Sequence, residues 1–264
     1  MDNIKLIVSD MDGTLLDHKG HLNSKFFELF EIMTDKEIKF AVASGRQYYS
    51  LIELFGSISS DIYFLSDNGA SIIRNGKDIL RHYITKYKVD QIIQLSRKLN
   101  GAQLVICGRD YAYTDIEGLD VVSELNKHFK LRKQVNDLME VNDEIIKVSI
   151  CHPHGAEYNI LPLIKPIFGD ELQVVVSSDI WVDIMSKGVS KGSSLNFLQS
   201  KYSIGYDNTM CFGDYFNDVE MFSQCKYSYA MENAHPEVKK YARFIAPSNK
   251  DYGVISVLEE LLLN

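Results

Sequence analysis

Four acidic residues in two short segments are the side chains of this sequence best placed to do chemistry. Asp10 and Asp12 stand two residues apart, and Asp214 and Asp218 stand four apart in a segment that also contains Asn217. Carboxylates this close together can share a divalent cation, and an oxygen-rich site of this kind suits Mg²⁺. Because carboxylates repel phosphate, such a metal ion is needed if the substrate is a phosphate ester.

Two further segments offer groups that bind phosphate oxygens. Ser44-Gly45-Arg46 provides a hydroxyl and backbone N–H groups near a predicted helix start, which is a natural seat for a phosphate oxygen. Lys191 begins another predicted helix and adds a positive charge. Two interpretations of Arg46 remain open, since its guanidinium could pair with a core carboxylate or contact the substrate.

Short apolar strands position these segments. Apolar runs predict strands over residues 4–9, 39–43, 62–66, 209–212 and 227–231, and helical spacing predicts helices over 23–33, 47–55, 191–201, 217–223 and from 252. Asp67-Asn68-Gly69 supplies a turn after the third strand. This alternation is typical of an α/β fold with a parallel sheet covered by helices, whose sites lie at the strand ends.

The middle of the chain has an alternation of its own. Helices are predicted over 89–99, 119–129 and 156–168, and strands over 103–107, 144–151 and 172–176. We therefore predict two domains. Residues 1–82 and 186–264 form the catalytic core, and residues 83–185 form an inserted α/β domain that covers the site and sets substrate specificity.

In this order, the four segments resemble the motifs of the haloacid dehalogenase superfamily of phosphohydrolases, specifically its Cof-type branch, subclass IIB. The similarity covers the whole chain and extends to Asn68-Gly69-Ala70, to Asp183-Ile184 with the run 188–192, and to the run 231–234. It implies a Rossmann-like parallel-sheet core with an inserted α/β cap of type C2B. One departure from the family pattern is the bulky pair Tyr215-Phe216, where the first position commonly holds a small residue. This departure affects the expected shape of the metal-binding side of the site.

The resemblance implies a role for each motif residue. Asp10 would attack phosphorus and form an aspartyl-phosphate, while Asp12 would protonate the leaving alcohol and then activate water. Mg²⁺ would be bound by the side chains of Asp10 and Asp214 and by the backbone carbonyl of Asp12, with Asp218 supporting these ligands. The phosphoryl oxygens would be held by groups on Met11, Ser44, Gly45, Lys191 and Asn217.

Composition excludes several other classes. The 264 residues carry a net charge of −8, so an excess of Lys and Arg that could neutralise a nucleic acid or an anionic membrane is lacking. The four cysteines form no CxxC pair, which predicts reduced thiols in a cytoplasmic protein rather than disulfides or a zinc site. His152 and His154 are predicted to belong to a polar loop, and Trp181 to pack in the cap. The sequence indicates no oligomeric state.

The predicted function is a Mg²⁺-dependent phosphatase of small phosphorylated metabolites such as sugar phosphates. A phosphomutase of the same superfamily would share the core and the nucleophile, and ranks second. A non-catalytic sensor of a phosphorylated metabolite would be favoured by loss of a motif carboxylate, and none is lost. A nucleotide-sugar transferase with a DxD metal site is disfavoured, because Gly13-Thr14 follows the first pair of acids.

Overall fold

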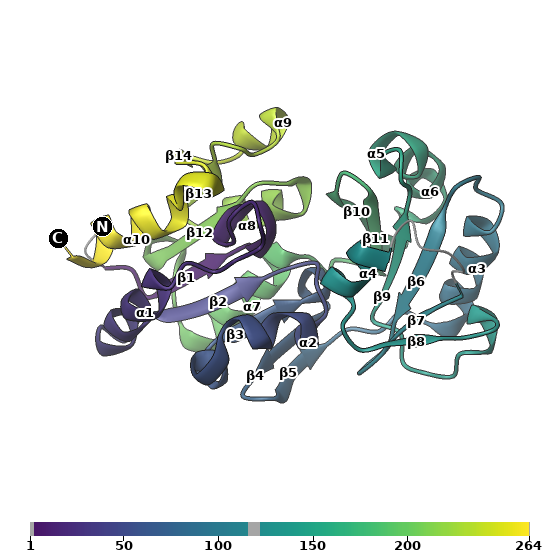
Figure 1. Cartoon of the computed structure of the whole chain (residues 1–264), viewed down its shortest axis with the longest axis horizontal. Helices are drawn as coiled ribbons and strands as arrows, with labels where there is room; N and C mark the ends of the chain where they lie inside the picture. Colours follow the sequence, from purple (N-terminus) through teal and green to yellow (C-terminus); the bar gives the residue numbers. More distant parts are fainter. Residues whose placement is uncertain (1–2, 116–121, 264) are drawn as a thin grey trace.

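Two β-sheets give the molecule two lobes (Figure 1). The computed structural model describes residues 3–115 and 122–263. The core sheet consists of β1 (Leu6–Ser9), β2 (Lys39–Ala43), β3 (Tyr63–Ser66), β4 (Ser71–Arg74), β5 (Lys77–Arg81), β12 (Thr209–Gly213), β13 (Tyr227–Met231) and β14 (Phe244–Ala246). Its strand order is β14-β13-β12-β1-β2-β3-β4-β5.

The first six strands of this order are parallel, which confirms the predicted sheet type. Ser9, at the end of β1, lies in register with Val42 of β2 and with Phe212 of β12. The residues that follow these three strands therefore meet at one edge of the sheet. β4 and β5 pair antiparallel beyond β3 and were not predicted. In β5, two of the five residues are exposed and the other three are only half-buried, so it shows no buried apolar run.

Helices flank the core sheet on both sides (Figure 1). They are α1 (Lys25–Asp35), α2 (Tyr48–Leu51), α7 (Lys191–Tyr202), α8 (Val219–Ser223), α9 (Pro236–Lys239) and α10 (Gly253–Leu263). The helix predicted over 47–55 is shorter than expected, since α2 passes into 3₁₀ turns over Ile52–Leu54 and Gly56–Ser60. Gly56 has a positive φ of 51°, which interrupts the helical backbone there.

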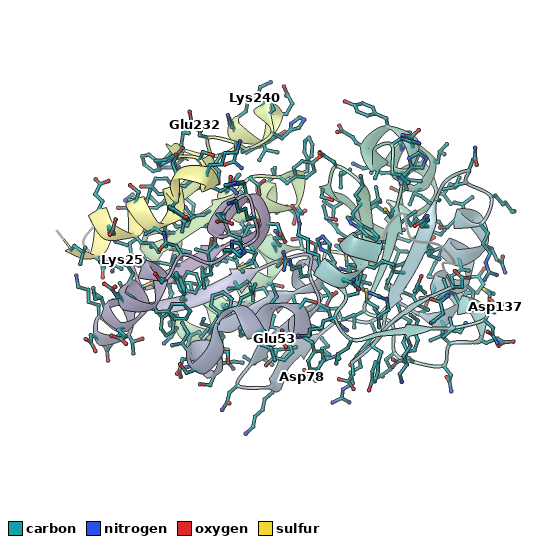
Figure 2. The ribbon with its side chains drawn as sticks, viewed as in Figure 1. Lys25, Glu53, Asp78, Asp137, Glu232 and Lys240 are labelled. Carbon is teal, nitrogen blue, oxygen red and sulfur yellow. The ribbon has the colours of Figure 1, made fainter. Side chains whose placement is uncertain are left out.

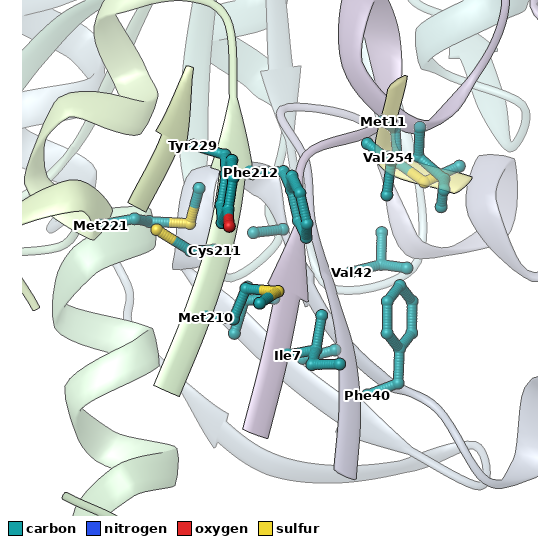
Figure 3. Close-up of a cluster of buried hydrophobic side chains, with 14 of the residues drawn as sticks. Ile7, Met11, Phe40, Val42, Met210, Cys211, Phe212, Met221, Tyr229 and Val254 are labelled. Atoms are coloured by element: carbon teal, nitrogen blue, oxygen red, sulfur yellow. The ribbon is translucent and has the colours of Figure 1, made fainter. Parts of the chain in front are cut away.

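The interior of the core lobe is apolar. Figure 3 shows Ile7, Met210 and Phe212 from β1 and β12 packed beside Phe40 and Val42 from β2. All of these side chains are buried, and α1 adds Phe26, Leu29, Phe30 and Met33 from one helical face. The core lobe therefore buries a hydrophobic cluster of its own, which holds the strand ends in place.

The cap sheet lies in the second lobe, with the strand order β10-β11-β9-β6-β7-β8. Its strands are β6 (Gln103–Cys107), β7 (Ala112–Thr114), β8 (Arg132–Gln134), β9 (Lys147–Cys151), β10 (Leu172–Ser178) and β11 (Trp181–Ser186), and its helices are α3 (Lys86–Ser96), α4 (Val122–His128), α5 (Ala156–Asn159) and α6 (Leu161–Phe168). The predicted helix 156–168 is divided at Ile160, because Pro162 follows and lacks an N–H. Residues 119–121 of the predicted helix 119–129 lie outside the described residues.

Charged side chains of both signs cover the described surface. Lys25, Lys240 and Glu232 project from the core lobe and Asp137 from the cap lobe (Figure 2). Within residues 3–115 and 122–263, no helix is both long and apolar enough to cross a membrane.

Candidate active site

Lys191 joins two of the predicted acidic residues inside the core. It begins α7, whose first turn is fixed by a capping box. Its Nζ donates to Oδ1 of Asp10 and to Oδ1 of Asp218, each at 2.6 Å, and the lysine side chain is fully buried. The backbone N–H of Asp10 donates to the carbonyl of Phe212 at 3.0 Å, which ties the end of β1 to β12. The structure thus brings these segments together at the strand ends, where the α/β pattern predicts a site.

Asp214 lies against the turn that follows Asp10. Thr14 Oγ1 donates to Asp214 Oδ1 at 3.0 Å, and Asp218 Oδ2 accepts the backbone N–H of Asp214 at 2.9 Å. Gly13 has a φ of +78°, and a Cβ added there would lie 2.3 Å from Asp214 Oδ2. Only glycine allows this approach, because any side chain would displace the carboxylate. The glycine of the first motif therefore makes room for an acid of the fourth.

The three carboxylates of Asp10, Asp214 and Asp218 can present oxygens that all lie within 4.8 Å of one another. Burial raises the pKa of Asp10 to about 7, although Lys191 opposes the shift, and the charge of Asp218 adds to it. Burial and then the charge of Asp10 raise the pKa of Asp214 well above its ordinary value. The Lys191 ammonium balances only part of this negative charge, so the donor set fits a hard divalent cation.

Asp12 lies apart from these carboxylates and forms ion pairs instead. Arg46 donates to both of its oxygens, from Nε at 2.7 Å and from a terminal nitrogen at 2.5 Å. Lys127 of α4 places Nζ 3.2 Å from Asp12 Oδ1. Burial opposes ionisation, but the hydrogen bond and charge of Arg46 outweigh it and hold the pKa of Asp12 well below its usual range. Of the two interpretations of Arg46, the structure shows the pairing with a carboxylate.

The end of β2 and a core turn supply the uncharged groups. Ser44 Oγ accepts the backbone N–H of Arg46 at 3.1 Å, and a hydroxyl that accepts one bond keeps its own O–H to donate. Asn217 Nδ2 donates to Asn68 Oδ1 at 2.9 Å, so a neighbouring core side chain orients this amide. Met11 is fully buried. Binding of phosphate by Met11, Ser44, Gly45, Lys191 and Asn217 remains a prediction.

A cavity of about 270 Å³ opens between the lobes beside these groups. Its core side includes Asp10, Asp12, Ser44, Gly45, Asp214 and Asn217, and its cap side includes Lys127, His128, Trp181 and the turn at residues 177–179. Trp181 also packs edge to face against Phe129, with the ring centroids 5.7 Å apart. It therefore has the predicted packing role and also lines the cavity. Carboxylates, lysine side chains and hydroxyl groups thus line a space the size of a small metabolite.

The family model for haloacid dehalogenase-like hydrolases matches residues 7–258 of the chain. The chain belongs to the haloacid dehalogenase-like hydrolases. This membership confirms the prediction that the protein is an enzyme. One relative, the 5-amino-6-(5-phospho-D-ribitylamino)uracil phosphatase YbjI of Escherichia coli, is 30% identical over 98% of this chain and 97% of its own.

Solved structures agree with this family. SMU.1108c of Streptococcus mutans superposes with a TM-score of 0.94 and 29% identity, over 99% of this chain and 100% of its own. The subclass IIB sugar phosphatase BT4131 superposes with a TM-score of 0.82 at 20% identity, over 97% of this chain and 98% of its own, which shows a shared fold. The predicted superfamily and its capped α/β fold are confirmed.

In this haloacid dehalogenase-like hydrolase, the bulky pair in the fourth motif reaches the cap. Tyr215 OH donates to Asp179 Oδ1 at 2.9 Å, and both residues line the cavity. Phe216 packs against the hydrophobic cluster of the cap. The sequence identified this departure but not its partner, since no local pattern links Tyr215 to a turn 36 residues earlier. Lys127 and His128 were missed for the same reason.

The raised pKa of Asp10 predicts how the metal-free hydrolase responds to pH. The unfolded chain releases this proton near its ordinary pKa of 3.8, while the folded protein keeps it up to about 7. Stability should therefore fall as pH rises through this window, by on the order of 4 kcal/mol at about 1.4 kcal/mol per pH unit. Thermal melts in chelator at pH 4 to 7 measure the slope, which Asp10→Asn should flatten and the exposed Asp35→Asn should not. A slope unchanged in Asp10→Asn would contradict this assignment.

Proposed function

We propose that the protein is a Mg²⁺-dependent phosphatase that hydrolyses small phosphorylated metabolites through an aspartyl-phosphate on Asp10. The observation that carries the proposal is the position of Asp10, which lies buried at a strand end, bonded to Lys191 and open to the cavity. A carboxylate held in one orientation beside a positive charge is suited to attack a phosphorus atom that a cavity presents to it.

The residues divide the reaction between them. Asp10 forms the bond to phosphorus, and the bond from phosphorus to the leaving oxygen breaks. Lys191, the Ser44 hydroxyl and backbone N–H groups near Met11 and Gly45 stabilise the charge that spreads over the phosphoryl oxygens. Water then attacks the phosphorus of the aspartyl-phosphate, which regenerates Asp10 and releases inorganic phosphate.

Asp12 moves the protons in both halves of this reaction. Its ionised state beside Arg46 suits the second half, in which it takes a proton from the attacking water. In the first half it must carry a proton to the leaving alcohol, so its contacts with Arg46 and Lys127 must weaken when substrate occupies the cavity. Asp12 lines that cavity with 29% of its side chain exposed, within reach of an entering leaving group.

Asp10 and Asp214 would hold Mg²⁺ with their side chains and Asp12 with its backbone carbonyl, while Asp218 supports Asp214 and Lys191 through hydrogen bonds. When bound, Mg²⁺ neutralises charge on the phosphoryl oxygens and on the acidic group.

The size of the cavity limits the substrate to a small phosphorylated metabolite. About 270 Å³ suits a sugar phosphate or a molecule of similar size, and the cap closes over it. The names of YbjI, a phosphoribitylaminouracil phosphatase, and of BT4131, a sugar phosphatase, support this class. We place the enzyme in the cytoplasm because its four cysteines, all within the described residues, are buried thiols that form no disulfide.

A screen of small phosphorylated metabolites, followed by phosphate release with and without Mg²⁺, tests the proposed function. We expect turnover of a subset of the panel, and at least a 10³-fold loss in excess chelator or in Asp214→Ala, on the scale of a lost charge-stabilising group. Asp170→Ala, in the cap and far from the acidic group, is the matched control. Full activity in chelator would reject the metal, and isomerisation of a bisphosphorylated sugar without phosphate release would indicate a mutase.

A further inference from the structure

Lys147 belongs to the cap by sequence, but its ammonium group contacts the core beside the cavity. It is the first residue of β9, and only 1% of it is exposed. Its Nζ donates to the carbonyl oxygen of Gly45 at 2.5 Å, and lies 3.1 Å from Asp67 Oδ1 and 3.8 Å from Asp183 Oδ2. A cap side chain therefore contacts the loop at the end of β2 that is the candidate seat of a phosphate oxygen.

The contact with Gly45 fixes the orientation of one peptide group. The carbonyl of Gly45 and the N–H of Arg46 belong to the same planar unit, so they point to opposite sides. Lys147 holds the carbonyl, and the N–H donates to Ser44 Oγ at 3.1 Å. Because that oxygen accepts from Arg46, the hydroxyl hydrogen of Ser44 is left to donate into the cavity. The direction of the Ser44 hydroxyl thus depends on Lys147.

A second route leads from Lys147 through a strained turn. Asp67 and Asn68 both have positive φ, 52° and 56°, which is costly for residues other than glycine. The backbone N–H of Asp67 donates to the Arg46 carbonyl and that of Asn68 to the Ser44 carbonyl, at 3.0 and 2.9 Å. The turn thereby holds the same loop, and the ion pair of Asp67 with Lys147 anchors it.

The network ends at another residue of the cavity. Asp183 Oδ2 accepts from Asn68 Nδ2 at 2.5 Å, and Asn68 Oδ1 accepts from Asn217 Nδ2 at 2.9 Å. Since a carboxylate only accepts, it determines which end of the Asn68 amide faces Asn217. Gly45 and Asn217, at opposite ends of this chain of contacts, line the cavity together with Asp10.

Burying a lysine and two carboxylates together costs desolvation free energy. Burial lowers the pKa of Lys147, but Asp183 and Asp67 outweigh it and raise the pKa above its ordinary value, so the group stays charged. Apolar residues of the same volume would often be as stable as buried ions of this kind. What the ions provide is a fixed geometry that joins a cap strand to two phosphate-binding elements of the core.

We propose that Lys147 is a positioning residue of the phosphate site, so that the cap contributes to binding the phosphoryl group as well as to choosing the leaving group. The inference rests on the proposed phosphatase function. Its ligand is a tetrahedral oxyanion whatever alcohol it was attached to. Removal of Lys147 should therefore lower kcat/KM for all substrates by the same factor, whereas loss of a leaving-group contact changes the ranking of substrates by kcat/KM.

The test measures binding of inorganic phosphate by calorimetry with Mg²⁺ present, together with kcat/KM over a panel of esters. Lys147→Met should weaken phosphate binding at least tenfold, and should lower kcat/KM by one common factor across the panel. Lys88→Met is the matched control, because this cap lysine is ion-paired with Glu171 on the surface. Because Lys147→Met leaves two buried carboxylates without their cation, a triple variant with Asp67→Asn and Asp183→Asn provides a neutral network that should fold.

Either folded variant binding phosphate like the parent would overturn the inference, and so would a loss confined to esters with large leaving groups. These outcomes are distinct from failure of the proposed function. In that case the parent protein itself would release no phosphate from any ester, whereas an incorrect inference leaves a fully active parent and an unimpaired Lys147→Met.

Discussion

Asp10→Asn should abolish turnover while leaving the fold intact. Asparagine has almost the same size and shape, so the bond of the residue's N–H to β12 and its packing are retained. The amide cannot attack phosphorus as the carboxylate does, and the aspartyl-phosphate therefore has no route of formation. We expect a loss of at least about 10⁴-fold in kcat, the scale seen when a covalent nucleophile is removed. Phosphate release with Mg²⁺, on the best substrate of the screen, measures it.

The control for this variant is a comparable substitution outside the site. Asp61→Asn removes an exposed carboxylate and should leave kcat unchanged. Lys191 keeps Asp218 as a partner in Asp10→Asn, so no buried ammonium is left unpaired. Rapid acid quenching provides a second measurement, because the parent should carry covalent phosphate during turnover and the variant none. Near-parent activity or labelled protein in Asp10→Asn would contradict the mechanism.

Much of the site follows from local sequence and the geometry of parallel strands. Asp10, Ser44 and Asp214 each come just after a strand whose apolar run is evident, and the register of β1 with β2 and β12 brings the strand ends together. The first residue of α7 was also predictable, because a helix beginning near Lys191 places that residue at a helix N-terminus facing the same edge. Sequence reasoning therefore found the groups that the core supplies.

The residues that the cap supplies were not predictable in the same way. Lys147, Lys127 and Trp181 act through contacts with residues more than fifty positions away, and no periodicity records such contacts. Lys147 lies within the predicted strand 144–151, although its ammonium lies between Asp67 of the core and Asp183 of the cap. The open question about Arg46 was of the same kind, since either partner satisfies a guanidinium and only the fold decides between them. The strands β7 and β8 have three residues each, too few to show the two-residue alternation of a strand, and they form through pairing with their neighbours in the sheet.

Replacement of residues 83–185 by a short Gly/Ser linker should collapse discrimination among metabolites. The core buries a hydrophobic cluster of its own and keeps the four motifs, so it should fold and retain weak activity on a small activated ester such as p-nitrophenyl phosphate. The deletion removes the residues that line the cap side of the cavity, including Trp181. It therefore also removes the contacts that distinguish one leaving group from another. The spread of kcat/KM over the metabolite panel should shrink by at least about 100-fold, the value of a few lost kcal/mol of selective binding.

The deletion can lower activity in two ways: by removing contacts with the leaving group, or by weakening the phosphate site. The second is expected because the deletion also removes Lys147 and Asp183 from the network that ends at Gly45 and Asn217. Binding of inorganic phosphate separates the two. If Lys147 positions the phosphate site, the deletion variant should bind inorganic phosphate as weakly as Lys147→Met does, although phosphate has no leaving group to lose. Intact and deleted proteins are compared by calorimetry with Mg²⁺, after thermal melts establish that the deleted protein unfolds cooperatively. A folded deletion variant that keeps the parent's ranking of metabolites would show that the core chooses the substrate. One that loses the ranking but binds phosphate like the parent would confine the cap to the leaving group.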